Sequence, residues 1–266
     1  MINTWIAATL VAAVAGVVGF FVVMRGAAFA AHALPLSAFP GAAAASLLGV
    51  NPLLGLLVFA ALGVAGISWL ARRARRDLAT ALSLVLLLSL GALFLSRTTE
   101  YFQATYALLF GEILGVSRAE LWPVFALSSA SIALVVVLFR PLLLNSVSPE
   151  IAETMGVPAR LMDVLFLGVV ALATAMAVPV VGTLLVFSLM VGPASAARAL
   201  TDRPLSAMML SAGLAVVMVW AAIALSFISD WPVGFFVGAL SAIAYFAGRV
   251  WSSALPLRRA AAVGAP

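Results

Sequence analysis

The sequence predicts an all-α polytopic membrane protein with about nine transmembrane helices and one short helix outside the membrane. Of its 266 residues, 65% are hydrophobic and only 9% are charged. In soluble domains about a quarter of the residues are charged, so this composition excludes a soluble globular protein. It also excludes a disordered chain, which needs low hydrophobicity and high charge. Because a transmembrane helix takes roughly 20 apolar residues, the length leaves no room for a sizeable extramembrane domain.

The expected spans are apolar runs between charged residues and Pro or Gly punctuation. The first lacks a basic leader and a cleavage site, so we expect it to be retained rather than removed as a signal peptide. The second contains Pro35 and Pro40, so we expect it to be kinked or broken. Only Pro179 and Gly182 separate the sixth from the seventh, and the count becomes eight if one broken segment does not cross. The nine expected spans are 4–24, 29–50, 52–71, 79–96, 119–139, 161–178, 180–197, 205–228 and 232–249.

The spans define one predicted transmembrane domain, residues 1–250. The Ala- and Arg-rich residues 251–266 are expected to form a disordered cytoplasmic tail. Residues 98–118 are too interrupted by polar residues to form a clean span, so we expect them to connect two spans on the outer side. Cysteine is absent, which excludes a disulfide framework, a thiolate metal site and a cysteine nucleophile.

All 14 basic residues are arginines, and nine acids leave a net charge of +5. In a soluble protein this balance would suggest nucleic acid, but here it fits arginines in cytoplasmic loops, and we expect no nucleic-acid partner. If the N-terminus lies outside, only Arg97 and Arg118 fall on the outer side. The positive-inside rule therefore predicts an outer N-terminus and an inner C-terminus. The inner arginines would be Arg25, Arg72, Arg73, Arg75, Arg76, Arg140, Arg160, Arg198, Arg203, Arg249, Arg258 and Arg259.

The inner loop between the fifth and sixth spans is predicted to form a short helix. Ser148 can cap it, Pro149 suits the first helical position, and Glu150 favours the positive end of the helix dipole. Gly156 can close the helix, and Pro158 prevents its continuation. Such a helix presents a compact surface to a partner, although the simpler interpretation is a plain connection between two spans.

Two stretches could line a path through the membrane. His32, the only histidine, lies in the Pro-containing second span, and its imidazole suits Zn, Mn or Fe. A tight metal site needs three or four ligands, so a histidine bonded to a backbone carbonyl is the simpler interpretation. Residues 178–198 combine Pro and Gly breaks with small residues, which fits either a translocation-lining helix or a packing face. The path or packing candidates are Pro35, Pro40, Gly41, Pro179, Gly182, Gly192 and Pro193.

Four stretches carry a family resemblance. Residues 25–41 resemble a Gly-Asp-Ala-Leu-Ser-His-Ala-…-Pro-Gly motif, and residues 109–114 resemble Leu-Phe-Gly-(Asp/Ser)-Ile-Leu. Residues 148–157 resemble a cytoplasmic coupling segment, and residues 181–194 resemble Val-Gly-…-Leu-Leu-…-Pro-Ala. In this order, and over most of the chain, they are similar to the permease subunits of bacterial metal-uptake ABC transporters, which import zinc, manganese or iron.

The resemblance implies a transport subunit of the bacterial cytoplasmic (inner) membrane. A separate ABC ATPase subunit would dock on the inner face, a second copy of the permease would complete the pore in the lipid bilayer, and an extracytoplasmic solute-binding protein would dock outside. The ATPase-coupling residues would be Ser148, Pro149, Glu150, Ala152 and Gly156. The binding-protein contacts would be Glu100, Glu112 and Asp230.

The metal motif departs from the family pattern. Aligned on Pro40-Gly41, the family aspartate falls at His32, and the family histidine, one helical turn later, falls at Leu36. His32 is therefore the one candidate ligand. Metal selectivity would then reside mainly in the binding protein, or the substrate would differ from a free divalent ion. Two copies of the chain could still bring two His32 side chains together.

We expect no permanently bound cofactor and no enzymatic activity of the chain alone. The sequence has no lysine, so it lacks the Gly-x-x-x-x-Gly-Lys-Ser/Thr phosphate loop, and ATP would bind only to the partner subunit. An ion-coupled secondary transporter is the main alternative, but it needs intramembrane acids, and the acids fall in predicted loops or at span ends. An intramembrane enzyme would need Ser with His, paired aspartates or His-Glu-x-x-His, and no such motif exists.

Overall fold

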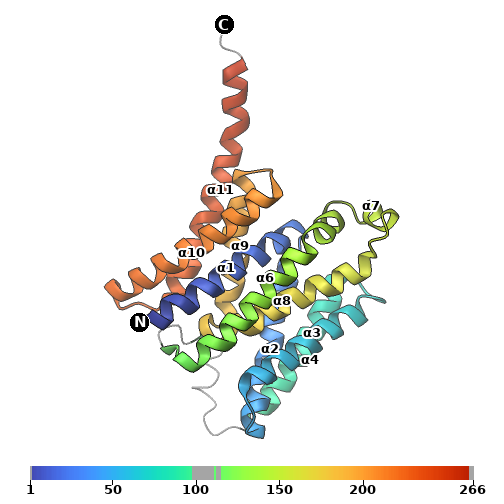
Figure 1. Cartoon of the computed structure of the whole chain (residues 1–266), viewed down its shortest axis with the longest axis vertical. Coiled ribbons are helices and arrows are strands. Elements are labelled where there is room, and N and C mark those ends of the chain that lie inside the picture. The colour runs from blue at the N-terminus through green and yellow to red at the C-terminus, as the bar shows by residue number, and fades with distance from the viewer. Residues whose placement is uncertain (1, 98–110, 112–114, 264–266) are drawn as a thin grey trace.

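The computed structural model describes residues 2–97, 111 and 115–263, with side chains through residue 252. Over these residues it contains helices and their connections, without strands, and nine helices are long and apolar enough to cross a membrane (Figure 1). The all-α polytopic fold is thereby confirmed. The nine are α1 (Ile2–Met24), α2 (Ala28–Leu48), α3 (Pro52–Leu70), α4 (Arg76–Leu95), α6 (Arg118–Val147), α8 (Ala159–Val181), α9 (Thr183–Leu200), α10 (Pro204–Ser229) and α11 (Val233–Val263).

Two helices extend well beyond their expected spans. α6 continues through Arg140 and Pro141 to Val147, because an exposed arginine can keep its charge in water while its stem covers apolar surface. α11 is helical through Val263, which includes most of the tail expected to be disordered. Ala, Leu and Arg, which dominate that tail, are strong helix formers. The division of the chain into a domain and a tail at residue 250 stays a prediction.

The core of the bundle lies along α1, α2 and α8. Their most apolar windows are 67%, 67% and 72% buried, whereas those of α6 and α11 are 22% and 17% buried. Figure 1 shows α1 (dark blue) between α10 and α6. Close packing against α10 depends on Gly16, where an added Cβ would lie 2.5 Å from Cα of Ala212. Ser211 Oγ also donates a hydrogen bond to the Gly16 carbonyl at 2.7 Å. Small residues of this kind let membrane helices approach closely.

α2 is continuous through both of its prolines, so it is not broken, and the kink that was the other expectation stays a prediction. Neighbouring helices leave room for this proline-containing helix. A Cβ on Gly91 of α4 would lie 2.6 Å from Cγ of Pro40, and a Cβ on Gly41 would lie 2.0 Å from the carbonyl oxygen of Gly55 on α3. Prolines are tolerated in a membrane helix where neighbouring helices pack around them. Missing side chains on α3 and α4 thus accommodate α2.

The chain turns between α8 and α9 at a single residue, Gly182. Its φ of 84° and ψ of 158° lie in a region that is essentially restricted to glycine. Pro179, the other expected separator, remains inside α8. Gly111 packs on this turn, where an added Cβ would lie 2.4 Å from the carbonyl carbon of Val181. The sixth and seventh spans are therefore two helices, and only glycine fits their junction without strain.

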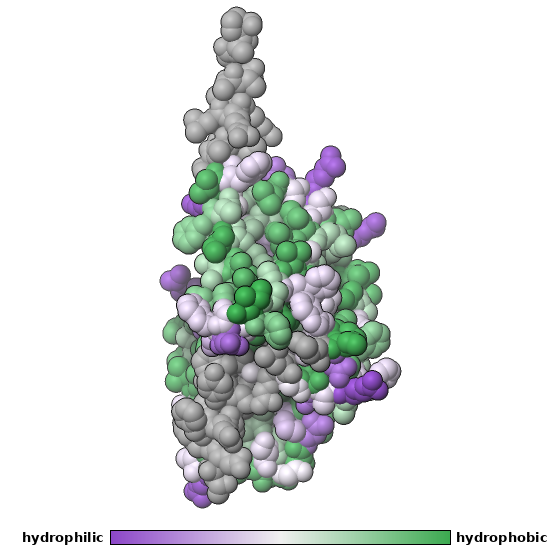
Figure 2. Space-filling model, turned by 90° about the vertical axis from the view of Figure 1, so that its left-hand side faces the viewer, coloured by the Kyte–Doolittle hydropathy of each residue, from purple (hydrophilic) through white to green (hydrophobic). Residues whose placement is uncertain are grey.

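The outside of the bundle suits a bilayer. On the face in Figure 2, most of the coloured residues are hydrophobic and the hydrophilic ones form separate patches. Large apolar side chains such as Val137 and Phe227, each 74% exposed, occur along the helices. In an aqueous protein so much exposed apolar surface would be a liability, but lipid or a second membrane subunit can cover it.

Candidate functional site

Charged side chains from several helix ends meet on one face of the bundle. Arg25, directly after α1, and Arg76, the first residue of α4, both form ion pairs with Asp163 in α8. Nearby, Nη1 of Arg198 in the last turn of α9 lies 3.4 Å from Sδ of Met24. These contacts bring arginines that are far apart in the sequence to the same side. The grouping agrees with the arginine sorting predicted from the sequence.

Arg25 is the most constrained residue of this face, with only 6% of its side chain exposed. Its guanidinium donates to Ser146 Oγ at 3.3 Å and, with the amide turned toward it, to the Asn145 oxygen at 3.0 Å. It also lies 4.8 Å from the centre of the Phe166 ring. Burial lowers the pKa of Arg25 below its ordinary value, and the Asp163 carboxylate opposes this effect. The arginine remains charged and links α1 to α6 and α8.

The predicted inner helix is present as α7 (Pro149–Thr154). The backbone N–H of Ile151 donates to Ser148 Oγ at 3.4 Å, Pro149 opens the helix, and Gly156 follows it with a φ of +79°. Capping, helix start and helix end are thus as predicted. Two apolar side chains that were not predicted to matter are also exposed here, Ile151 within α7 at 54% and Met155 directly after it at 69% exposure.

The faces of α7 differ in a way that suits docking. Ala152 is fully buried against the bundle, whereas Glu150 and Glu153 are exposed beside Ile151 and Met155. Exposed apolar residues rimmed by polar ones are typical of interaction surfaces. Hydropathy alone did not identify these two side chains, because it assigns apolar residues to membrane spans or to the protein core. The coupling role of Ser148, Pro149, Glu150, Ala152 and Gly156 stays a prediction.

His32 lies on α2 against Phe187 of α9, with ring centroids 5.0 Å apart and planes at 70°. Its Nδ1 is buried and has no hydrogen-bond partner among the described residues. The backbone-bonded arrangement considered from the sequence is therefore not seen at Nδ1. No group of three His, Cys, Asp or Glu side chains that could hold a metal occurs in the described part of the chain. The described residues thus bring His32 to α9 without a set of metal ligands around it.

Other path candidates are located at helix contacts. Gly192 of α9 faces Ser241 of α11, where an added Cβ would lie 2.6 Å from Ser241 Cβ, and Pro193 beside it is buried. Pro35 and Pro40 are buried within α2, whereas Pro179 is exposed on α8. The buried positions among them fit close packing, whereas Pro179 does not. A role in translocation stays a prediction for each of them.

Of the expected binding-protein contacts, the structure describes Asp230. Asp230 is exposed, ends α10 and adopts a left-handed conformation with a φ of 58°. The adjoining Trp231 packs on Phe235 and Phe236 at the start of α11. Glu100 and Glu112 lie outside the described residues. A docking role for these three acids stays a prediction.

The chain is similar to known membrane transport proteins. A model of the ABC 3 transport family (ABC-3) matches residues 1–252. A Streptococcus pneumoniae protein named manganese import system permease protein ScaB is 31% identical over 212 residues, which cover 80% of this chain and 76% of that protein. A Halalkalibacterium halodurans protein named manganese transport system membrane protein MntC is 27% identical over 226 residues, 84% of this chain and 77% of that protein.

The fold is also similar to a solved structure, described as PsaBC from Streptococcus pneumoniae in complex with Fab. The TM-score is 0.83 at 24% sequence identity, and the match covers 92% of this chain and 89% of that chain. At this identity the likeness concerns the fold alone. It shows that this fold also occurs in that solved structure.

Proposed function

The chain belongs to the ABC 3 transport family, and we propose that it is the membrane-spanning permease subunit of an ATP-driven importer of a divalent transition metal. The observation that carries this proposal is the family match over residues 1–252. The names of the two relatives favour manganese over zinc and iron. The metal is cargo, and no resident cofactor is needed for a subunit that only provides the path.

The proposed assembly has three further components. An ABC ATPase docks on α7 and hydrolyses ATP, a second copy of the permease completes the pore, and an extracytoplasmic binding protein delivers the metal. The exposed Ile151 and Met155 next to Glu150 support the ATPase contact, because a groove on a partner can cover them. The unsatisfied Nδ1 of His32 supports a ligand role that the described residues of one chain do not complete. We place the N-terminus outside and the C-terminus inside, on the grouping of the arginines.

Reconstitution tests this function directly. The permease, its neighbouring ATPase and its binding protein are incorporated into liposomes, and uptake of Mn²⁺, Zn²⁺ and Fe²⁺ is measured with and without ATP. We expect ATP-dependent uptake, fastest for Mn²⁺, and no ATP hydrolysis by the permease alone. Uptake driven by an ion gradient without ATP would instead identify a secondary transporter.

We predict that Ile151→Ala combined with Met155→Ala weakens ATPase binding about tenfold, because truncating apolar anchors of an interface costs more than about 1 kcal/mol. Binding of the purified ATPase to the permease in nanodiscs gives the affinity. The control is Phe227→Ala, which also removes an exposed apolar side chain, but near the C-terminal end of α10 and not on α7. Equal affinities of the double variant and the control would remove α7 from the ATPase interface.

We predict that His32→Phe slows Mn²⁺ uptake at limiting metal at least about tenfold, the smaller loss seen when groups supporting a metal ligand are removed. Phenylalanine keeps an aromatic ring against Phe187 and removes both nitrogen atoms. Leu36→Ala, one turn further along α2, is the control for altered packing. Normal uptake by His32→Phe with intact assembly would assign His32 to packing.

A further inference from the structure

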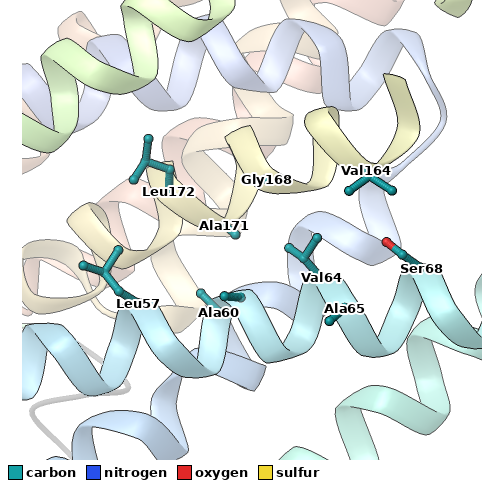
Figure 3. A pocket seen from close by; sticks show the side chains of 10 residues that line it. Leu57, Ala60, Val64, Ala65, Ser68, Val164, Gly168, Ala171 and Leu172 are labelled. Carbon is teal, nitrogen blue, oxygen red and sulfur yellow. The ribbon is translucent and has the colours of Figure 1, made fainter. Parts of the chain in front are cut away.

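Two cavities follow the contact between α3 and α8 and meet at Ser68 and Val164. Each has a volume of about 360 Å³. The first is almost wholly apolar, and Figure 3 shows its lining side chains along the facing sides of α3 and α8. The second lies at the arginine-rich face. Together they form one groove, called here the α3/α8 groove, which is apolar at one end and charged at the other.

The charged end of the α3/α8 groove has an excess of positive charge. Four arginines and two aspartates line it. Asp163 is already shared by Arg25 and Arg76. Arg72 and Arg160 are exposed and have no ion-pair partner among the described residues. These two guanidinium groups are available to an anion, and arginine binds phosphate oxygens well.

The apolar end has the length and the space for an acyl chain. Leu57 and Ser68, at its two ends on α3, are separated by about 16 Å of helix. This is about half of a hydrocarbon core of about 30 Å, and so equals one leaflet. On α8, an added Cβ at Gly168 would meet nothing within 4 Å, so this glycine leaves open space in the groove.

The junction of the two cavities carries an unsatisfied polar group. Ser68 Oγ is buried and has no hydrogen-bond partner among the described residues. In Figure 3 the Ser68 oxygen lies at one end of the cavity lining, near Val164. A buried hydroxyl is normally paired. At this position it could donate to an ester oxygen, which in a phospholipid joins the acyl chain to the headgroup.

We propose that the α3/α8 groove binds one anionic phospholipid of the inner leaflet, with its phosphate on Arg72 and Arg160 and one acyl chain along Gly168. The order of groups along the groove, cationic, hydroxyl and apolar, matches headgroup, ester and chain. A free phosphate would leave the apolar end uncovered. Basic pockets between helices on the cytoplasmic side are known lipid-headgroup sites.

Lipid titration of the full-length chain, followed by native mass spectrometry, tests the site. The probes are dioleoyl phosphatidylglycerol, dioleoyl phosphatidylcholine and inorganic phosphate. We expect phosphatidylglycerol to bind most tightly. Each arginine near anionic lipid contributes about 1 kcal/mol, which is about fivefold in affinity. The apparent Kd for phosphatidylglycerol should therefore rise about fivefold in Arg72→Ala and about thirtyfold when Arg160→Ala is added. Equal binding of the two lipids, or binding of phosphate as tight as that of phosphatidylglycerol, would overturn the proposal.

Matched variants separate the site from general effects. Arg73→Ala removes an exposed arginine from the same loop, but this residue does not line the groove, so we expect no change. Gly168→Leu should fill the apolar end and displace the lipid, whereas Gly213→Leu, at an equally open helical glycine of α10, should not. A loss in Arg73→Ala equal to that in Arg72→Ala, or normal binding by Gly168→Leu, would contradict the site.

Discussion

Asp163→Asn should lower the free energy of unfolding by about 3 kcal/mol, the lower end of the cost of breaking a buried ion pair from one side. The reason is that Arg25, only 6% exposed, would lose its carboxylate and stay charged in the bundle. Asn145 and Ser146 would still accept hydrogen bonds from it, but neither carries a charge. Unfolding of the purified chain in mixed micelles, followed by far-UV circular dichroism, measures the change.

Two controls define what this experiment reports. Arg76→Ala removes the other partner of Asp163, but its side chain is 73% exposed, so we expect a loss below about 1 kcal/mol. Arg25→Met combined with Asp163→Leu removes both charges and should recover most of the stability lost in Asp163→Asn. A double variant that is as unstable as Asp163→Asn would show that packing around Phe166, and not the buried charge, causes the loss.

Gly41→Ala should lower the free energy of unfolding by about 3 kcal/mol, the upper end of the usual cost of overpacking. The added Cβ would lie 2.0 Å from the Gly55 carbonyl oxygen, and a Cβ on Gly55 would lie 1.9 Å from that of Gly41. The obstacle is backbone on both sides, so α2 and α3 must separate. The same micelle unfolding measures the loss. Gly213→Ala should instead stabilise the chain by up to about 1 kcal/mol, because it meets no neighbour and alanine favours a helix.

The Gly41 variant also separates packing from transport. Gly41 was predicted from the sequence to lie on the path or at a packing face, and both positions are conceivable for a small residue beside Pro40. If Gly41→Ala leaves the free energy of unfolding unchanged but slows metal transport, Gly41 acts in the translocation path. If stability falls as expected and a second small residue, Gly41→Ser, also destabilises, the close α2–α3 approach is the reason for glycine.

Local chemistry explains what could be predicted from the sequence. The spans follow from runs of apolar residues between charges, and α7 follows from a capping serine, a proline at the helix start and a glycine at its end. The arginine sorting needed only the order of the spans. Each of these signals lies within a few residues, so one sequence contains it. Of the kink or break expected at Pro35 and Pro40, the break is absent, because the packing around α2 depends on Gly55 and Gly91, which lie on other helices.

Long-range contacts account for what was missed. Asp163 was counted as a span-end acid, although an acid inside an apolar run is a signal for a buried partner. Its partners Arg25 and Arg76 lie 138 and 87 residues away, and nothing local pairs them. The α3/α8 groove likewise exists only where two distant helices meet. His32 was found because a lone histidine in a span is conspicuous, but its contact with Phe187 was not.

The single-residue junction at Gly182 has a consequence for how the chain enters the bilayer. α8 and α9 are about 34 Å and 27 Å long, each close to the thickness of the hydrocarbon core. One residue is too short to form an aqueous loop between two helices of this length. We therefore expect α8 and α9 to enter the membrane together as a helical hairpin.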